Sequence, residues 1–309
     1  MKIFKNRGDI YISKSNYKSS TEERILLILL ALIIVFTTIF AIILNTKYSS
    51  VKEFFAGDEV TTEAVGVNPE DNLPQISGKR NFLIFETDSN KKIIHYIFLV
   101  QADRDNLSYK ICTLSPKTVI DSVSIADIYT SGGGAALQTK LTAFLGIDID
   151  YYADFDKDDF IAFINKLGTF VYPSDESVKF NDSVNNEDTY SVRLNKGEEN
   201  ITGNSLSGIL RYYSNDGYKL EKANQVIIYA LSGLFNEKNF DDSQSLFRLF
   251  INSSKTNITV RDFQDNIDAV EVFCKKNTDI SVYTANAEYD DNNVIVPESA
   301  KQIKSLLAE

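Results

Sequence analysis

The strongest feature of the hydrophobic pattern is a long apolar run near the N-terminus. Residues 25–44 carry no charge, and Thr37 and Thr38 are their only polar side chains. A helix of this length, at about 1.5 Å per residue, matches the roughly 30 Å hydrocarbon core of a bilayer. The run is longer than the apolar part of a cleaved signal peptide, and no small-residue cleavage pattern follows it. The pattern therefore predicts an uncleaved transmembrane signal anchor.

The charges beside this run predict its orientation. Residues 1–24 contain six basic and three acidic side chains, whereas Lys47 and Lys52 are the basic residues that follow closely. Basic flanking segments stay on the cytoplasmic side of a membrane. We therefore expect a single-pass protein of the cell membrane, with residues 1–24 as a cytoplasmic tail and the chain from residue 45 onward extracytoplasmic.

After the anchor, the pattern of polar and apolar positions changes twice. Residues 45–80 have little periodicity and contain acidic residues, two prolines and glycines, which is typical of a linker. From residue 81, short apolar runs typical of strands alternate with helical patterns, which predicts one α/β domain over residues 81–309. The expected strands cover residues 81–88, 93–102, 109–116, 147–156, 169–173, 190–197 and 280–286, with a hairpin-like return at 292–297. The expected helices cover residues 135–146, 156–168, 205–213, 243–251, 260–275 and 298–307, and one more begins within residues 214–225.

Composition excludes several classes of function. The net charge of −11 argues against a nucleic-acid partner, because binding a polyanion needs a concentrated basic surface. The single histidine, His95, lies in an apolar run, so we expect a buried strand position rather than a zinc site or a Ser/His/Asp triad. Cys112 and Cys274 also lie in apolar runs, and their spacing leaves open whether they form a disulfide.

Two segments contain residues that often bind ligands, but neither matches the sequence pattern of a phosphate-binding or calcium-binding loop. Gly132–Gly134 lacks the G-x-x-x-x-G-K-[ST] pattern of a phosphate loop, which favours a flexible turn before the next helix. The acidic run at residues 154–159 places Asp159 where a calcium loop requires glycine. We expect Asp158 or Asp159 to cap the following helix instead.

The stretch SNDGYKLEKANQ, residues 214–225, has two readings. Asp216 is suited to cap a helix, and Lys219 and Lys222 would lie on one flank of it. Two ammonium groups near a helix N-terminus could hold a diphosphate. The alternative, which these residues alone favour, is that lysines beside Glu221 are solvated surface.

Several segments, taken in their order along the chain, resemble the motifs of a known protein family. NFLIFETD (81–88) resembles a strand that ends in G-T-D, and TLSPKT (113–118) a strand that ends in P-R-D. Residues 145–168 resemble a central strand–helix block, and DGYKLEKANQ (216–225) resembles a D-x-x-R-x-x-R-Q helix. In this order and spacing, from about Asn81 to the C-terminus, the segments resemble the LytR-CpsA-Psr family of envelope proteins.

The resemblance implies a fold and an activity. It implies a single extracytoplasmic domain with a central mixed β-sheet flanked by helices, behind one N-terminal transmembrane helix. Family members are magnesium-dependent phosphotransferases that move a glycopolymer from a polyprenyl-pyrophosphate carrier onto peptidoglycan. The implied partners are therefore a lipid-linked glycopolymer, peptidoglycan and the membrane, the implied cofactor is Mg²⁺, and the carrier's lipid would lie in an apolar pocket.

Site residues follow from the resemblance position by position. Asp88 matches the aspartate of G-T-D and Asp216 that of the later helix, which implies catalytic aspartates that bind Mg²⁺. Lys117, Lys219 and Lys222 occupy arginine positions, which implies that they hold the pyrophosphate.

Other positions depart from the family pattern. Arg211 lies one place from an expected arginine, and we include it among the phosphate-binding candidates. Glu86 replaces the glycine of G-T-D, and residues 93–96 replace an R-S-D-T run. Lysine lacks the bidentate fork of arginine, so a non-catalytic relative that binds a lipid-linked precursor or an envelope partner is the alternative hypothesis.

Overall fold

The computed structural model describes residues 73–88, 93–182, 189–216 and 218–308. The chain from Pro69 to Glu309 forms one compact unit. The expected cytoplasmic tail and transmembrane segment lie outside the described residues, and both stay predictions. No helix in the described ranges combines the length and the apolar character needed to cross a bilayer.

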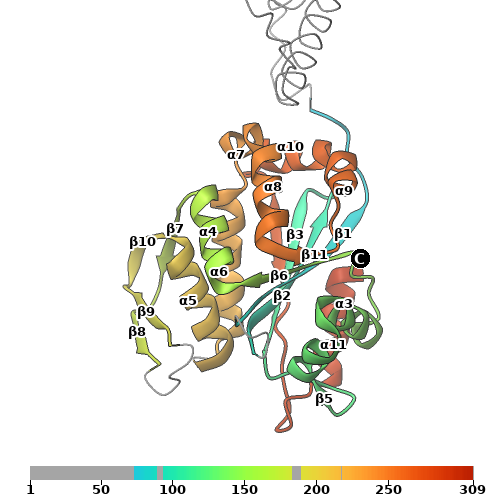
Figure 1. Ribbon diagram of the computed structural model, residues 1–309, viewed down its shortest axis with the longest axis vertical. Coiled ribbons are helices and arrows are strands. Elements are labelled where there is room, and N and C mark those ends of the chain that lie inside the picture. The colour runs from blue at the N-terminus through green and yellow to red at the C-terminus, as the bar shows by residue number, and fades with distance from the viewer. Residues whose placement is uncertain (1–72, 89–92, 183–188, 217, 309) are drawn as a thin grey trace, which may run out of the picture. The chain divides into compact units, whose positions relative to one another are not determined.

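A six-stranded mixed sheet forms the centre of the unit (Figure 1). Its order is β11-β6-β1-β2-β3-β12, with β1 antiparallel to β2 and parallel to β6. The strands are β1 (Lys79–Thr87), β2 (Ile94–Asp103), β3 (Ser108–Leu114), β6 (Tyr151–Asp156), β11 (Ser254–Thr256) and β12 (Ser281–Thr284). The predicted α/β class is thus confirmed, and the mixed sheet that the resemblance implied is present.

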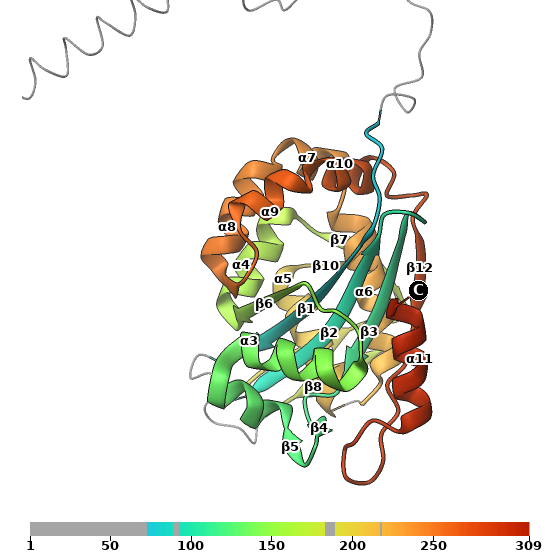
Figure 2. The same cartoon turned by 90° about the vertical axis from the view of Figure 1, so that its right-hand side faces the viewer.

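Helices cover both faces of the sheet, which explains the nearly continuous apolar runs of its central strands. On one face lie α4 (Lys157–Leu167), α5 (Gly203–Arg211) and α6 (Leu220–Leu234). The other face packs against α3 (Ile125–Leu145) and α11 (Pro297–Ala308), as Figure 2 shows. In β2, nine of the ten residues are buried, including His95 as predicted.

A helical segment extends the first of these layers beyond the sheet (Figures 1 and 2). It consists of α7 (Glu237–Asp241), α8 (Ser243–Ser253), α9 (Val260–Asp265) and α10 (Ile267–Lys275). Within the described ranges, three two-stranded antiparallel sheets lie outside the main sheet: β4 (Val119–Ile120) with β5 (Val123–Ser124), β7 (Phe170–Ser174) with β10 (Gly197–Ile201), and β8 (Val178–Asn181) with β9 (Ser191–Leu194).

The triple glycine does not begin a helix as expected, because α3 starts ten residues earlier than predicted. Ser124 caps α3 by accepting a hydrogen bond from the Asp127 amide at 3.1 Å. Gly133 alone leaves the helical conformation, with φ of 67°, so the expected turn is a kink within one helix. Gly134 lies against the sheet, where an added Cβ would be 2.5 Å from the Tyr152 ring.

Three other helices differ from the predictions. The N-cap of α4 is Asp156, not Asp158 or Asp159, because the preceding strand ends there. The expected helix over residues 260–275 is two helices that meet at Asn266. Helix α6 begins at Leu220 with Lys219 as its N-cap, so Asp216 does not cap it. Asp216 instead ends a π-helical turn, η2 (Tyr212–Asp216), that continues α5.

Candidate functional site

An apolar cavity of about 400 Å³ lies between one face of the sheet and the helices packed over it. Strands β1, β2 and β6 form its floor, and helices from α4 to α10 form its walls. Aromatic rings dominate the lining: Phe155 lies 5.6 Å from Phe160 and 5.8 Å from Phe250, centroid to centroid. Such a lining suits an apolar chain better than a polar ligand.

Strand alternation explains why this floor is apolar with polar groups at both ends. Successive residues of a strand face opposite sides of a sheet. On β1, Arg80, Phe82 and Ile84 line the cavity, and the next residue on the same face is Glu86. On β2, the corresponding residues run from Tyr96 through Phe98, Val100 and Ala102 toward Arg104. One face of a single hairpin therefore carries arginines at one end and a glutamate at the other.

The end of this hairpin face that carries Glu86 is buried under other parts of the domain. Glu86 is fully buried, and its Oε2 accepts hydrogen bonds from Ser207 Oγ at 2.8 Å and Tyr96 Oη at 3.1 Å. Burial raises the pKa of Glu86 to about 7, although those two hydrogen bonds and the positive charge of Arg211 oppose the shift. Arg211 is itself 5% exposed, and its guanidinium lies 4.1 Å from the centroid of the Tyr190 ring.

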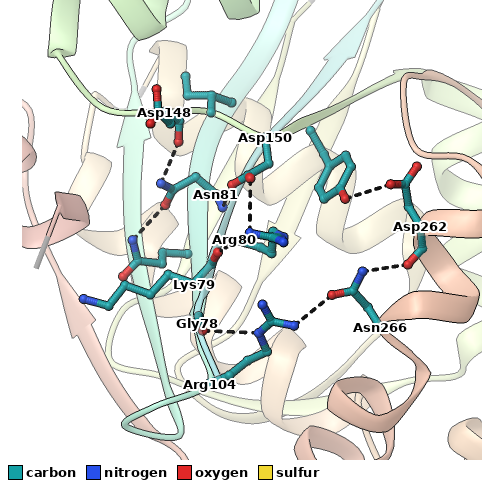
Figure 3. Close-up of polar contacts among 12 residues, drawn as sticks. Gly78, Lys79, Arg80, Asn81, Arg104, Asp148, Asp150, Asp262 and Asn266 are labelled. Atoms are coloured by element: carbon teal, nitrogen blue, oxygen red, sulfur yellow. Dashed lines mark hydrogen bonds and ion pairs between the residues drawn. The ribbon is translucent and has the colours of Figure 1, made fainter. Parts of the chain in front are cut away.

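At the arginine end, Arg80 and Arg104 make polar contacts with neighbouring backbone and side-chain groups (Figure 3). Arg80 has a side-chain exposure of 40%, and its Nη1 lies 3.0 Å from the Lys79 carbonyl and 3.5 Å from Asp150 Oδ1. Arg104 donates to the Gly78 carbonyl at 3.2 Å and to Asn266 Oδ1 at 2.9 Å. Burial, followed by the positive charge of Arg80, lowers the pKa of Arg104.

The predicted lysines lie outside the cavity lining and pair with acidic side chains. Lys219 Nζ lies 2.6 Å from Glu176 Oε2, and Lys222 forms an ion pair with Asp175. The hydrogen bond to Glu176 raises the pKa of Lys219, and the bond to Lys222 lowers the pKa of Asp175. Both acids follow β7 in the chain, at a place that the spacing of the lysines could not indicate.

The remaining predicted residues lie at the ends of strands and helices. Asp88 follows β1, and its amide donates to the Ile93 carbonyl at 3.1 Å. Lys117 is exposed in the turn after β3, where its amide donates to Ser115 Oγ at 3.2 Å. Cys112 and Cys274 are unpaired and buried, and burial raises the pKa of each thiol to about 12.

A buried aspartate that the sequence analysis considered only as part of the acidic run at residues 154–159 lies close to the end of β1. Asp154 is 2% exposed, and it accepts hydrogen bonds from Tyr129 Oη at 2.6 Å and Thr87 Oγ1 at 3.1 Å. Because β1 and β6 are parallel neighbours, their carboxyl ends meet here. A parallel pairing of these two runs was the signal that could have located Asp154 opposite Phe85, close to the end of β1.

Magnesium fits this region only together with a ligand. Within the described ranges, no three His, Cys, Asp or Glu side chains are grouped closely enough to hold a metal ion. Mg²⁺ commonly uses one or two carboxylates and takes its other ligands from substrate phosphates and water. Asp154 already accepts hydrogen bonds from two hydroxyl groups, and the assignment of Asp88 to a metal stays a prediction.

Comparisons with known proteins agree on the fold. The model of the LytR_cpsA_psr family matches residues 95–309. A search of curated proteins gives no match. Among solved structures, a transcription regulator from Eubacterium siraeum has a TM-score of 0.64 at 17% identity, over 78% of this chain and 96% of that chain. TagV of B. subtilis has a TM-score of 0.55 at 16% identity, over 75% of this chain and 96% of the TagV chain. TagT bound to LI-WTA has a TM-score of 0.53 at 16% identity, over 74% of this chain and 89% of the TagT chain. At these identities the structures support the fold alone.

Proposed function

The chain belongs to the LytR-CpsA-Psr family, and from this premise we propose that it is a membrane-anchored envelope protein that handles lipid-linked glycopolymers. The carrier's polyprenyl tail would lie in the apolar cavity, and the glycopolymer would pass to peptidoglycan. The observation that carries the proposal is the cavity itself, about 400 Å³ with an aromatic and aliphatic lining. TagT, a neighbour in fold, has been solved with LI-WTA bound, which supports a glycopolymer as the ligand class.

Transfer would exchange the phosphoanhydride bond of the pyrophosphate for a phosphodiester bond. The bond between the glycopolymer's phosphorus and the carrier's phosphate oxygen breaks, and a bond forms from that phosphorus to a peptidoglycan hydroxyl. The hydroxyl's proton passes to solvent, and polyprenyl phosphate leaves. Bound Mg²⁺ would neutralise charge that develops on the phosphates.

Residues of this chain would position the phosphates. We propose that Asp88 and Asp216 hold the metal, and that Lys117, Lys219 and Lys222 bind the pyrophosphate. For the last two, binding requires exchange of their present carboxylate partners for phosphate oxygens. Arg211 is buried and lies beside Glu86, so its proposed effect on phosphate is at longer range.

The second candidate is a non-catalytic relative that binds the precursor without transferring it. A specific observation favours it: Glu86 places a buried carboxyl group on the same face of β1 as the cavity floor, where the family's G-T-D motif has glycine. The ion pairs of Lys219 and Lys222 with internal acids favour it too, since they reduce the positive charge available to a pyrophosphate.

A transfer assay separates the candidates. The full chain in nanodiscs receives a synthetic polyprenyl-pyrophosphate-linked glycopolymer, peptidoglycan and Mg²⁺, and polymer joined to peptidoglycan is measured. We expect transfer that EDTA abolishes and that Asp88→Asn lowers by at least about 100-fold. Precursor binding without joined polymer supports the non-catalytic candidate. Absence of both binding and transfer contradicts the proposed function.

A further inference from the structure

The two edges of the six-stranded sheet differ in how they are protected from pairing with another strand. β11 forms one edge, and β12 forms the other beside β3 (Figure 2). An open edge presents unpaired N–H and C=O groups, and proteins commonly protect it with charged side chains, above all lysine. β11 carries the exposed Lys255 at its centre, whereas residues 280–285, which include β12, contain neither a charged side chain nor proline. The β12 edge therefore lacks the protection that β11 has.

The backbone of β12 has hydrogen-bonding groups on its outer side. β12 is parallel to β3, and the amides of Ser281 and Ala285 donate to carbonyl groups of the neighbouring segment at 3.1 Å and 3.0 Å. Successive residues of a paired strand direct these groups to opposite sides, so those of Val282 and Thr284 point away from β3. Within the described ranges, neither of these two amides donates a hydrogen bond, and β12 has no second partner strand.

The side chains of β12 are suited to antiparallel pairing with an identical strand. If Val282 of one copy lies opposite Thr284 of the other, both residues exchange their outward N–H and C=O groups. Tyr283 then lies opposite Tyr283 of the other copy at a non-hydrogen-bonded position, where Cα atoms are about 4.5 Å apart. The side chain of Tyr283 is 52% exposed, and an aromatic pair across two strands is stabilising.

The charges on either side of β12 favour the antiparallel orientation. Residues 275–280, before the strand, contain two lysines and one acid, and residues 285–291, after it, contain three acids and no base. Lys275 is already paired with Glu271, but Lys276 forms no ion pair in the described part of the chain. An antiparallel pair places the first segment of one copy beside the second segment of the other, whereas a parallel pair places the acids together. Such charge complementarity selects an orientation more than it adds affinity.

We propose that β12 is a self-association surface, on which a second copy of this chain adds its own β12 in antiparallel orientation and extends the sheet across a two-fold axis. The same strand is used by both copies, so association stops at the dimer. β12 has four residues, so the contact is small and the dimer dissociates readily in solution. The expected membrane anchors would raise the local concentration of the chains, which favours a weak contact. This inference does not depend on glycopolymer transfer.

Disulfide trapping of the full chain in proteoliposomes tests the contact. Tyr283→Cys places two thiols across the two-fold axis, at a Cα separation that suits a disulfide. With a mild oxidant, we expect at least about tenfold more covalent dimer from Tyr283→Cys than from Tyr229→Cys, since Tyr229 is exposed on α6 instead. The unaltered chain is the second control, because its Cys112 and Cys274 are buried.

Val282→Pro separates backbone pairing from other contacts. Proline removes the outward amide hydrogen of this residue and is tolerated in edge strands. Sedimentation of the full chain in detergent micelles should show a dimer whose fraction rises with protein concentration. Val282→Pro should raise the dissociation constant at least about tenfold, and its unfolding temperature should stay within about 2 °C of that of the unaltered chain, because no hydrogen bond within the domain is lost.

Each outcome supports or overturns the proposal. Equal yields of covalent dimer from Tyr283→Cys and Tyr229→Cys would show random collision and overturn the contact, as would a chain that sediments as a monomer at every concentration. A dimer that Val282→Pro leaves unchanged, or covalent species larger than a dimer, would place self-association at another surface.

Two further measurements cover the remaining cases. If Val282→Pro does not fold, Tyr283→Lys carries the test, because it places like charges opposite each other at an exposed position and should abolish the dimer. Hydrogen exchange of the monomer examines the competing occupant, a segment of the same chain. Slow exchange of the Val282 and Thr284 amides in the monomer would show that such a segment covers the edge, which overturns the proposal; fast exchange supports it.

Discussion

Glu86 should make the folded domain less stable as pH rises from 5 to 8. Its pKa is about 7 in the folded protein, against an ordinary value of 4.5, so the folded state holds this proton more tightly than the unfolded state. The stability associated with the protonated group is therefore fully present below about pH 4.5 and is lost as pH rises through about 7. At 1.36 kcal/mol per pKa unit, the difference corresponds to roughly 3 kcal/mol.

Substitution Glu86→Gln isolates this contribution. Glutamine has no titrating group, and its amide oxygen can still accept the hydrogen bonds of Tyr96 and Ser207. The assay is urea unfolding of residues 69–309 at pH 5 and pH 8, followed by far-UV circular dichroism because the chain contains no tryptophan. The loss of unfolding free energy between these pH values should be about 2–3 kcal/mol smaller in the variant. Equal losses in both proteins would refute the argument that burial controls the ionisation of Glu86.

Three further predictions follow from buried groups. Asn224→Ala should lower the unfolding free energy by about 2–3 kcal/mol in urea titrations, because the Thr113 amide and hydroxyl both donate to the Asn224 side chain; a loss below about 0.5 kcal/mol would contradict this. Ala230→Phe should weaken farnesol binding about tenfold by mass spectrometry, because the larger ring fills the cavity, whereas unchanged binding would place the ligand elsewhere. Cys112 and Cys274 should both react with a thiol reagent after unfolding and slowly before it; recovery of fewer than two thiols without reductant would show a disulfide.

The strands of the sheet could be predicted from sequence, and the helix boundaries less well. The runs at residues 81–88 and 93–102 pair as expected, since two apolar runs with a short polar connection favour a hairpin. The start of α3 was misplaced because glycine is an unfavourable helix residue, whereas here the packing of Gly134 against Tyr152 needs the absence of a side chain. Tertiary contact overrides local preference at that position.

The ends of the cavity could not be predicted because they depend on register. The β1–β2 register pairs Arg80 with Ala102, which brings Arg104 into the neighbourhood of Arg80 across the hairpin. Similarly, the partners of Lys219 and Lys222 come from residues more than forty positions earlier in the chain, and no local pattern reveals them. The resemblance to the family located the helix that carries these lysines but gave no indication of the acids opposite them.

The proposed function requires that the apolar cavity hold the lipid chain of a phosphate-bearing ligand. Photoaffinity labelling of the full chain in nanodiscs, with a polyprenyl phosphate that carries a diazirine on its tail, tests this requirement. Peptide mass spectrometry should locate the label on cavity residues such as Phe98, Leu210 and Phe250, and an excess of unlabelled polyprenyl phosphate should prevent it. Label confined to residues 25–44 or to surface residues outside the cavity lining would contradict the requirement.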